Sequence, residues 1–460
     1  MISGFGLRIS RVVERVVPDP FVIAIFLTLV TAIAALLWGD FGDQSSFIGV
    51  LDSWRDSSNG MWKLLSFSMQ MCLILVTGYA LATTSLVRAM IHRLADIPTS
   101  TAAAAAIVGL VACICGLVNW GLGLIVGALL AREVGFSMQR RNKPCHYPLI
   151  AAAGYVGLLV WHGGLSGSAP LSMTTKLGAE KVVPTQFLDQ LESISLSSSI
   201  GSPMNLLISG GLVLLIPTVL ASLAPKNAND IRPIDTFGVD SGGRQEPIQQ
   251  HEHLPDKLNH SPYIAWLLAV PLLIALCRYM YVSGIDRLGL NEITMFMLGA
   301  GLLLHGSPVG YMQAVARGAK GCAGIIIQFP LYAGIMAIMV ASGLMGSLTE
   351  LMVGMGSKDT LPLLTMLSAG IVNLFVPSGG GQWAIQAPIA LESGLQSGVS
   401  PGTMVMAVAY GDQLTNMLQP FWALPLLAIT GVRARDIVGY TVIVMVAATV
   451  WIAFGLLIAG

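Results

Sequence analysis

Charged residues are scarce in this chain. Only 10% of the 460 residues are Asp, Glu, Lys or Arg, whereas 54% are hydrophobic and the mean hydropathy is +0.74. A soluble domain carries about 25% charged residues, so we predict an all-α polytopic membrane protein in the lipid bilayer. The formal net charge is zero, and no basic patch or nucleic-acid-binding motif is present. We therefore exclude nucleic acid as a partner.

The motifs that mark most enzymes and metalloproteins are also missing. The six cysteines are scattered and form no CxxC pair, which argues against a zinc or redox site. The patterns GxSxG, HExxH and the P-loop are absent as well. We expect no enzymatic activity, no cofactor and no metal ion other than Na⁺. Without an ATPase module, primary active transport would need a partner protein.

Long apolar runs, by contrast, fill most of the sequence. Arg8, Arg11 and Arg15 precede a first run, Pro20–Trp38, which is long for a signal peptide and is interpreted as a retained span. Runs with no interruption predict the spans Trp62–Val87, Gly201–Ala224, Pro262–Cys277, Ile293–Leu304, Gly321–Leu348 and Val438–Ile458. Four further runs are interrupted: about 101–131, 147–175, 360–391 and 403–432.

The sharpest interruption is Val376-Pro377-Ser378-Gly379-Gly380-Gly381-Gln382-Trp383, in the middle of the run 360–391. Proline and consecutive glycines are the residues least able to continue a helix. Non-helical backbone at membrane depth is tolerated only where protein buries it or where it lines a polar cavity. The break therefore predicts a binding site, with unpaired backbone N–H groups at a helix start available to an anion.

The interruptions recur in the same order in both halves of the chain. Breaks at 119–123 and 161–170 precede a polar segment, and breaks at 373–383 and 410–420 follow it. Such matched interruptions are typical of transporters built from inverted repeats. We predict two inverted repeats, 1–224 and 285–460, each with a re-entrant hairpin (101–131, 360–391) and a broken transmembrane helix (147–175, 403–432). A cytoplasmic linker, 225–260, and a connecting transmembrane helix, 261–284, lie between them.

Loop charges agree with this topology. Cytoplasmic loops are enriched in Lys and Arg close to the membrane. With the N-terminus in the cytoplasm and both hairpins re-entrant, no dense basic loop falls on the outer side, and the following residues fall on the inner side: Arg88 and Arg93; Arg132, Arg140, Arg141 and Lys143; Lys226 and Arg232; Arg317 and Lys320; Arg433 and Arg435. The first hairpin then enters from the cytoplasm and the second from outside.

Two titratable residues stand inside the interrupted runs. Asp412 is the only charged residue from Thr403 to Val432, and an intramembrane carboxylate needs a partner, an ion or water. It is a candidate cation ligand or proton acceptor, the alternative being a buried structural acid. His162 is a candidate substrate ligand or proton carrier, the alternative being a hydrogen-bonded core histidine. No Lys or Arg lies within the breaks, which favours a small monoanion held by backbone N–H groups and neutral side chains.

The candidate site residues follow from these breaks. The predicted substrate-binding residues are Asn119, Trp120, Gly121, His162, Gly163, Gly164, Ser166, Ser168, Ser378, Gly379, Gly380, Gly381, Gln382, Thr415 and Asn416, and the predicted cation-coupling residues are Asn119, Asn373, Asp412 and Asn416. Trp120, Trp161 and Trp383 stand beside three of the breaks and are candidates to pack a short apolar tail.

At these residues the chain resembles the short-chain fatty acid transporter family, within the broader ion transporter superfamily. The resemblance covers essentially the whole chain and rests on residues 376–383, on Trp-His-Gly-Gly-Leu-Ser-Gly-Ser at 161–168 and on Gly-Asp-Gln-Leu-Thr-Asn at 411–416. It implies secondary import of small monocarboxylates such as acetoacetate or butyrate across a bacterial inner membrane. It also implies a scaffold domain, a mobile domain carrying both hairpins, elevator-type movement and a homodimer.

Other interpretations stay open on the residues alone. A sodium/proton exchanger or an ion channel would use Asp412 and His162 for ions only. An integral membrane enzyme is disfavoured, because His162-Gly163-Gly164 is only faintly similar to a lipase oxyanion loop and the hydrolase motifs are absent. No motif decides between sodium and proton coupling.

Overall fold

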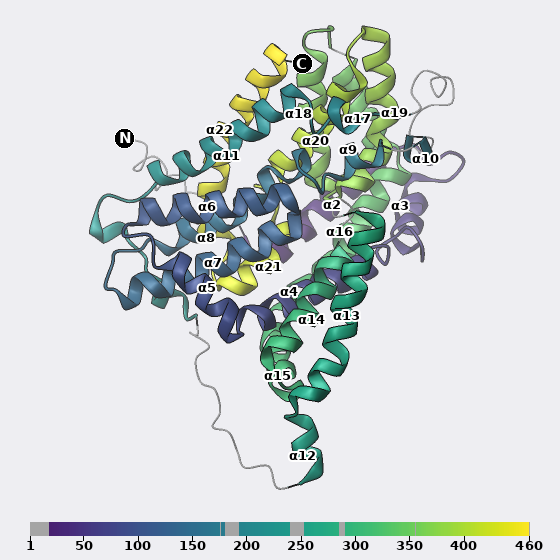
Figure 1. The fold of residues 1–460 in the computed structure, drawn as a ribbon. Helices are drawn as coiled ribbons and strands as arrows, with labels where there is room; N and C mark the ends of the chain where they lie inside the picture. The colour runs from purple at the N-terminus through teal and green to yellow at the C-terminus, as the bar shows by residue number, and fades with distance from the viewer. Residues whose placement is uncertain are drawn as a thin grey trace.

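A computed structural model describes residues 18–174, 176–179, 193–239, 253–284, 290–354 and 356–459. The predicted contributions of Arg8, Arg11 and Arg15 lie outside these ranges, as does most of the segment 240–260. The described residues form helices and no strands (Figure 1). Within them, nine helices are long and apolar enough to cross a membrane. The prediction of an all-α polytopic membrane protein is confirmed.

The first half runs from α2 to α11. Its elements are α2 (Pro20–Trp38), α3 (Ser46–Arg55), α4 (Leu65–Ala82), α5 (Ser85–Ala95), α6 (Thr101–Val118), α7 (Trp120–Arg140), α8 (Tyr147–Tyr155), the 3₁₀ turns η1 (Val156–Leu159) and η2 (Trp161–Gly163), α9 (Ser168–Ser172), α10 (Lys176–Ala179), η4 (Leu196–Ser198) and α11 (Pro203–Ser222). Helices α6 and α7 form a hairpin around one residue, and η1 and η2 interrupt the run that continues α8.

The second half repeats this order. After α12 (Leu254–Asn259) and α13 (Pro262–Ser283) come α14 (Leu290–His305), α15 (Pro308–Ala319), α16 (Ala323–Ala341), α17 (Leu344–Val353), α18 (Leu361–Phe375), α19 (Gly379–Ser397), α20 (Pro401–Thr415), α21 (Pro420–Thr430) and α22 (Ala434–Ala459). Each half therefore passes through a longer helix, a short one, a longer one, a short one, a hairpin, an interrupted helix and a closing helix.

The short helices were not predicted. The expected spans Trp62–Val87 and Gly321–Leu348 are wrong in extent, because α4 ends at Ala82 and α16 ends at Ala341. At the first break, the hydroxyls of Thr83 and Thr84 donate back to the carbonyls of Ala80 and Leu81. At the second, Gly343 adopts φ +68°, a conformation that favours glycine and ends the helix.

The helices gather in two groups (Figure 1). Helices α6, α7 and α8 pack together and against α11 and α22, whereas α13, α14 and α15 lie on the opposite side of the molecule around α4. Helix α16 packs against α2 and α3. The two groups meet where α5 and α21 contact α7. Helices α18, α19 and α20 form a further bundle.

Glycines bring the first hairpin onto α8 with backbone against backbone. A side chain on Gly127 would meet the carbonyl oxygen of Gly154, and one on Gly116 would meet the carbonyl oxygen of Gly157. In return, a Cβ on Gly154 would stand 2.6 Å from the Gly127 oxygen. Small residues allow this approach, which is the usual basis of tight helix packing in membranes. We call these four glycines the glycine seam.

The first part of the predicted linker is not a free chain. The backbone N–H of Tyr147 donates to the carbonyl of Arg232 at 2.9 Å, and the Arg232 guanidinium pairs with Asp436 at 2.8 Å. Ile234 is 1% exposed. The buried His146 bonds Tyr440 Oη through Nε2 at 2.8 Å and accepts the Arg232 N–H at Nδ1. The segment therefore fastens the ends of α8 and α22, where we expected only a polar linker.

This fastening is expected to be pH-dependent. Burial first, and then the Arg232 guanidinium, lower the pKa of His146 from 6.5 to about 4. Between these values the unfolded chain binds a proton that the folded protein does not. The contribution of His146 to the free energy of unfolding is thus fully present above pH 6.5 and is lost as the pH falls toward 4, by up to about 3 kcal/mol.

Melting temperatures at pH 7.5 and pH 5 measure this loss. The variant His146→Gln should show a smaller loss of stability at pH 5, whereas His253→Gln, at an exposed histidine, should lose as much as the wild type. Equal losses in the two variants would show that His146 does not cause the pH dependence.

Candidate functional site

The first hairpin turns at Asn119, with no loop between α6 and α7. Asn119 Oδ1 accepts from the N–H groups of Gly121 at 2.9 Å and Leu122 at 3.2 Å. The N–H of Trp120 donates to Ser166 Oγ at 2.9 Å. The first N–H groups of α7 are therefore satisfied by protein. Asn119, Trp120, Gly121 and Ser166 are close together as predicted, but they leave no open N-terminus for an anion at this tip.

The second hairpin turns at residues 376–378, and its tip differs. Ser378 Oγ accepts from the N–H of Gly381 at 3.2 Å, and its carbonyl accepts from the N–H of Gln382 at 2.7 Å. The N–H groups of Gly379 and Gly380 have no hydrogen-bond partner among the described residues. Gly379 is buried and Gly380 is exposed. This tip therefore presents two unpaired donors at a helix start, the arrangement that suits an anion.

The interrupted helix of the first half places His162 in the interior. His162 Nδ1 lies 2.5 Å from Asp412 Oδ2, and these side chains are 0% and 2% exposed. The other ring nitrogen, Nε2, accepts the N–H of Ala169 at 3.0 Å. Because a backbone N–H can only donate, Nε2 carries no proton here, and the proton of the neutral ring lies on Nδ1, facing the carboxylate. The two predicted titratable residues thus form one buried pair.

The interrupted helix of the second half is tied to the second hairpin through Asn373. Its Nδ2 contacts the Asp412 carbonyl at 2.8 Å, Thr415 Oγ1 at 3.0 Å and Asn416 Oδ1 at 3.0 Å. Gln419 Nε2 donates to the Asn373 carbonyl. The predicted coupling residues Asn373, Asp412 and Asn416 are therefore brought together. Asn119 is not among these contacts, and its Oδ1 is used in capping α7.

The second hairpin tip lies directly against the first interrupted helix. A Cβ built on Gly379 would stand 2.6 Å from Ser168 Oγ, 2.9 Å from the Trp161 ring and 3.0 Å from His162 Cε1. Ser168 Oγ is also 3.3 Å from His162 Nε2. The open donors of this tip, a hydroxyl and the buried histidine thus share one small volume. It joins segments that are more than 200 residues apart in the sequence.

Several buried polar atoms around this volume lack a partner among the described residues. The acceptors are Asn373 Oδ1, Gln382 Oε1 and Gln419 Oε1, and the donors are Trp161 Nε1 and Gln413 Nε2. An unpaired buried polar group is costly, so such atoms mark places where a ligand or ion can bind. Oxygen acceptors suit a hard cation. The orientation of Asn373 is fixed because its Nδ2 already faces three oxygens. The described residues contain no cluster of three or more His, Cys, Asp or Glu for a transition metal.

A comparison with known protein families identifies the chain at this point. A family model described as "Short chain fatty acid transporter" matches residues 1–459. The chain belongs to the short-chain fatty acid transporter family. A Haemophilus influenzae relative is 37% identical over 452 residues, 96% of each chain, and an Escherichia coli relative is 36% identical over 465 residues, 99% of each. Both are provisionally named short-chain fatty acid transporters. The solved Alcanivorax borkumensis YdaH transporter is 16% identical, over 95% of this chain and 98% of that one, with a TM-score of 0.42.

Aromatic rings cover one side of the site in this family member. Trp161 stacks on the His162 ring with centroids 4.2 Å apart. Trp120 packs edge-on against the Trp161 ring, with centroids 6.3 Å apart. Trp422 packs edge-on to Trp120 at 5.1 Å. Of the three tryptophans predicted to pack an apolar tail, Trp120 and Trp161 are therefore neighbours. Trp383 is buried in a separate apolar cluster with residues of α20.

Some predicted residues support the backbone of the breaks. The Gly163 carbonyl accepts from Asn205 Nδ2 at 2.8 Å. The N–H of Leu165, which follows Gly164, donates to the Leu117 carbonyl at 2.7 Å. Thr415 Oγ1 donates to the Gly370 carbonyl at 2.9 Å. Gln382 Nε2 donates to the Ala369 carbonyl at 2.8 Å, which leaves only its oxygen unpaired. These residues lie where the sequence indicated, and their bonded atoms hold the non-helical segments in place.

Sequence reasoning missed four residues that complete the site: Asn205, Tyr155, Gln413 and Gln419. Asn205 Oδ1 accepts from Tyr410 Oη at 2.9 Å, and Tyr155 Oη donates to the Asn416 carbonyl at 2.8 Å. Gln413 Oε1 accepts from the N–H of His162 at 3.2 Å. For Asn205, Gln413 and Gln419 the available signal was an amide side chain within an apolar run, since polar groups at membrane depth need internal partners.

Proposed function

We propose that this chain is a secondary active transporter that imports short-chain fatty acids, small monocarboxylates such as acetoacetate or butyrate. Membership of the transporter family supports transport itself. The observation that carries the substrate class is the second hairpin tip, with its two unpaired N–H groups beside Ser168 and the Trp161 ring. Backbone N–H groups and neutral side-chain donors can bind one carboxylate group. A dicarboxylate would place a second negative charge in the site with no cationic side chain to compensate it.

In this proposal the carboxylate binds to the N–H groups of Gly379 and Gly380 and to the Ser168 hydroxyl. Trp161 Nε1 and Gln413 Nε2 are unpaired buried donors in the same region. The short apolar tail packs on Trp120 and Trp161, whose rings already lie edge-to-face. A short chain fits such a wall, whereas each additional methylene needs further apolar surface.

We assign coupling to a cation, with Na⁺ as the candidate ion. Asn373 Oδ1 and Gln419 Oε1 are unpaired oxygens next to the break that carries Asp412. A bound Na⁺ would supply positive charge close to the buried carboxylate and to the incoming anion. The residues themselves orient the site, because Asn373 holds α18 to the break through three contacts.

The repeated order of elements supports inverted repeats, with one re-entrant hairpin from each side and an elevator-type movement of the group that carries both. We place the N-terminus in the cytoplasm and the protein in a bacterial inner membrane as a homodimer. The basic residues at the ends of α5 and α7 suit a cytoplasmic face. The alternative, a sodium/proton exchanger or ion channel, is favoured by one observation, the buried His162–Asp412 pair, which is able to exchange a proton.

Uptake of labelled butyrate into proteoliposomes tests the proposal. We expect accumulation driven by a sodium gradient and counterflow by unlabelled butyrate, which a channel does not give. Asn373→Ala should raise the sodium concentration for half-maximal uptake by about tenfold, as for a lost bond to a charged group. Asn227→Ala, at an exposed linker position, serves as the control. Accumulation driven by protons alone would reassign coupling to His162 and Asp412, and transport of ions without butyrate would favour the exchanger.

A further inference from the structure

The ring of Trp120, on which the apolar tail is proposed to pack, is itself held by further aromatic rings. Trp422 of α21 packs edge-on against Trp120 at 5.1 Å. Phe67 of α4 lies 6.3 Å from the Trp120 ring and 5.9 Å from the Trp422 ring. Among the described residues, Trp161 has ring contacts with Trp120 and His162 alone. Trp120 therefore stands between Trp161 and the pair formed by Phe67 and Trp422.

The rings behind Trp120 also pack on one another. Phe67 stacks on Phe329 of α16 at 5.7 Å, and Phe329 stacks on Phe421 at 4.0 Å. Phe421 in turn packs edge-on against Trp422 at 5.0 Å. Phe329 and Phe421 are 1% and 0% exposed. We call Phe67, Phe329, Phe421 and Trp422 the rear rings. Since protein interiors are close-packed, the rear rings leave Trp120 no apolar space into which it can move.

Phe67 differs from the other rear rings in its burial and in the element that carries it. Its side chain is half-buried, whereas Trp422 is only 7% exposed. Phe67 belongs to α4, around which the second group of helices is arranged, and α4 packs against α7. Phe67 therefore fixes the position of Trp120 from outside the first hairpin. Its ring can also be removed with less loss of packing than a fully buried ring.

We infer that Phe67 limits the chain length of the carboxylate by holding Trp120 behind the apolar tail. The inference rests on the proposed function, which places the tail on Trp120 and Trp161. With Phe67 in place, a chain longer than that of butyrate must displace the Trp120 ring against the rear rings, and overpacking of a close-packed cluster is unfavourable. Without the Phe67 ring, Trp120 can turn into the vacated space, and a longer tail gains apolar surface. Phe67 touches no substrate in this scheme and is a positioning residue that acts through Trp120.

Competition for uptake of labelled butyrate by the full-length protein in proteoliposomes tests the inference. For unlabelled hexanoate and unlabelled butyrate, the concentration that halves uptake is measured, and the ratio of the two is compared between variants. We expect this ratio to fall about tenfold in Phe67→Ala, because hexanoate has two more methylenes and each buried methylene is worth about fourfold in affinity. A merely structural role of Phe67 would change both concentrations together and leave their ratio unchanged. Phe67→Leu keeps an apolar side chain at this position, so it should shift the ratio in the same direction by less, and it carries the test if Phe67→Ala does not fold.

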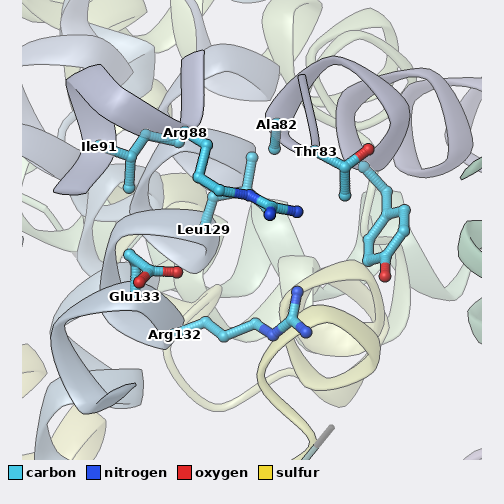
Figure 2. Close-up of a pocket in the computed structure, with 8 residues that line it drawn as sticks. Ala82, Thr83, Arg88, Ile91, Leu129, Arg132 and Glu133 are labelled. Carbon is cyan, nitrogen blue, oxygen red and sulfur yellow. The ribbon is translucent and has the colours of Figure 1, made fainter. Parts of the chain in front are cut away.

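Leu129→Ala is the matched control, with an apolar side chain shortened on the same helix as Trp120. Leu129 is half-buried and lines a small polar cavity between α4, α5 and α7 (Figure 2). It lies about 13.5 Å along α7 from Trp120, at 1.5 Å per residue, so its ratio should equal that of the wild type.

The outcomes separate this inference from the proposed function. Butyrate uptake with an unchanged ratio in the Phe67 variants would overturn the inference alone. A wild type in which hexanoate competes as well as butyrate would overturn the limit on chain length. A wild type that takes up no butyrate would overturn the proposed function, and the inference with it.

Discussion

Gly379→Ala is expected to lower butyrate uptake by about ten- to a hundredfold, whereas Gly380→Ala leaves it near the wild-type rate. A methyl group at position 379 would stand 2.6 Å from Ser168 Oγ and 2.9 Å from the Trp161 ring. At position 380 the nearest atom is Ser168 Cβ at 4.0 Å, an ordinary contact. Overpacking of this kind costs about 1–3 kcal/mol, and each 1.4 kcal/mol corresponds to a factor of about ten.

The two variants each add one methyl group to the start of α19, at neighbouring positions, so they differ only in where that methyl group lies. Initial rates of uptake into proteoliposomes measure the effect, and size-exclusion profiles show that both variants are folded. A methyl at 379 pushes the second tip away from the first interrupted helix, so the loss should appear mainly in affinity for the carboxylate. If the two alanine variants transport equally well, the second hairpin tip does not bind the substrate.

His162→Ala is expected to destabilise the protein strongly, whereas Asp412→Asn is expected to abolish coupled transport with a smaller loss of stability. The His162–Asp412 pair is fully buried. Removing the imidazole leaves a buried carboxylate without its N–H donor, which typically costs about 3–5 kcal/mol. Asparagine at 412 keeps the shape of the carboxylate and removes its charge, so no unpaired ion remains. Thermal unfolding and sodium-driven uptake together separate the two effects.

The double variant His162→Ala/Asp412→Asn provides the control. Its stability should exceed that of His162→Ala alone, because the buried charge is gone, and a double-mutant cycle gives the interaction free energy of the pair. Unchanged melting of His162→Ala would show that the pair does not stabilise the fold. Normal sodium-dependent uptake by Asp412→Asn would remove Asp412 from coupling.

The breaks in the helices could be predicted from the sequence because their causes are local. Asn119 ends α6 and begins α7, and residues 376–378 separate α18 from α19 where a proline and three glycines stand. The interruptions around His162 and after Thr415 were also placed correctly. Each depends on residues that cannot continue a helix, or on a side chain that caps one.

The partners across the site could not be predicted in the same way. His162 and Asp412 are 250 residues apart, and no spacing rule indicates that they form a hydrogen-bonded pair. The difference between the two hairpin tips depends on Ser166, which reaches the Trp120 N–H from another segment. The short helices α3, α5, α15 and α17 could not be predicted from long apolar runs. A short amphipathic helix either merges with the apolar run of its neighbour or forms no long apolar run of its own.

The glycine seam limits which parts of the molecule can act as a gate. A hinge needs free volume on both sides, and the carbonyl oxygens of Gly154 and Gly157 occupy the space beside Gly127 and Gly116. The first hairpin therefore cannot swing away from α8 without separating these backbone contacts. At the second tip, a Cβ on Gly380 would have no atom nearer than Ser168 Cβ at 4.0 Å, so no backbone contact of this kind is present there. Under the proposed function, a local opening that admits the substrate is therefore expected at the second hairpin and not at the first, so the two hairpins would contribute differently to transport.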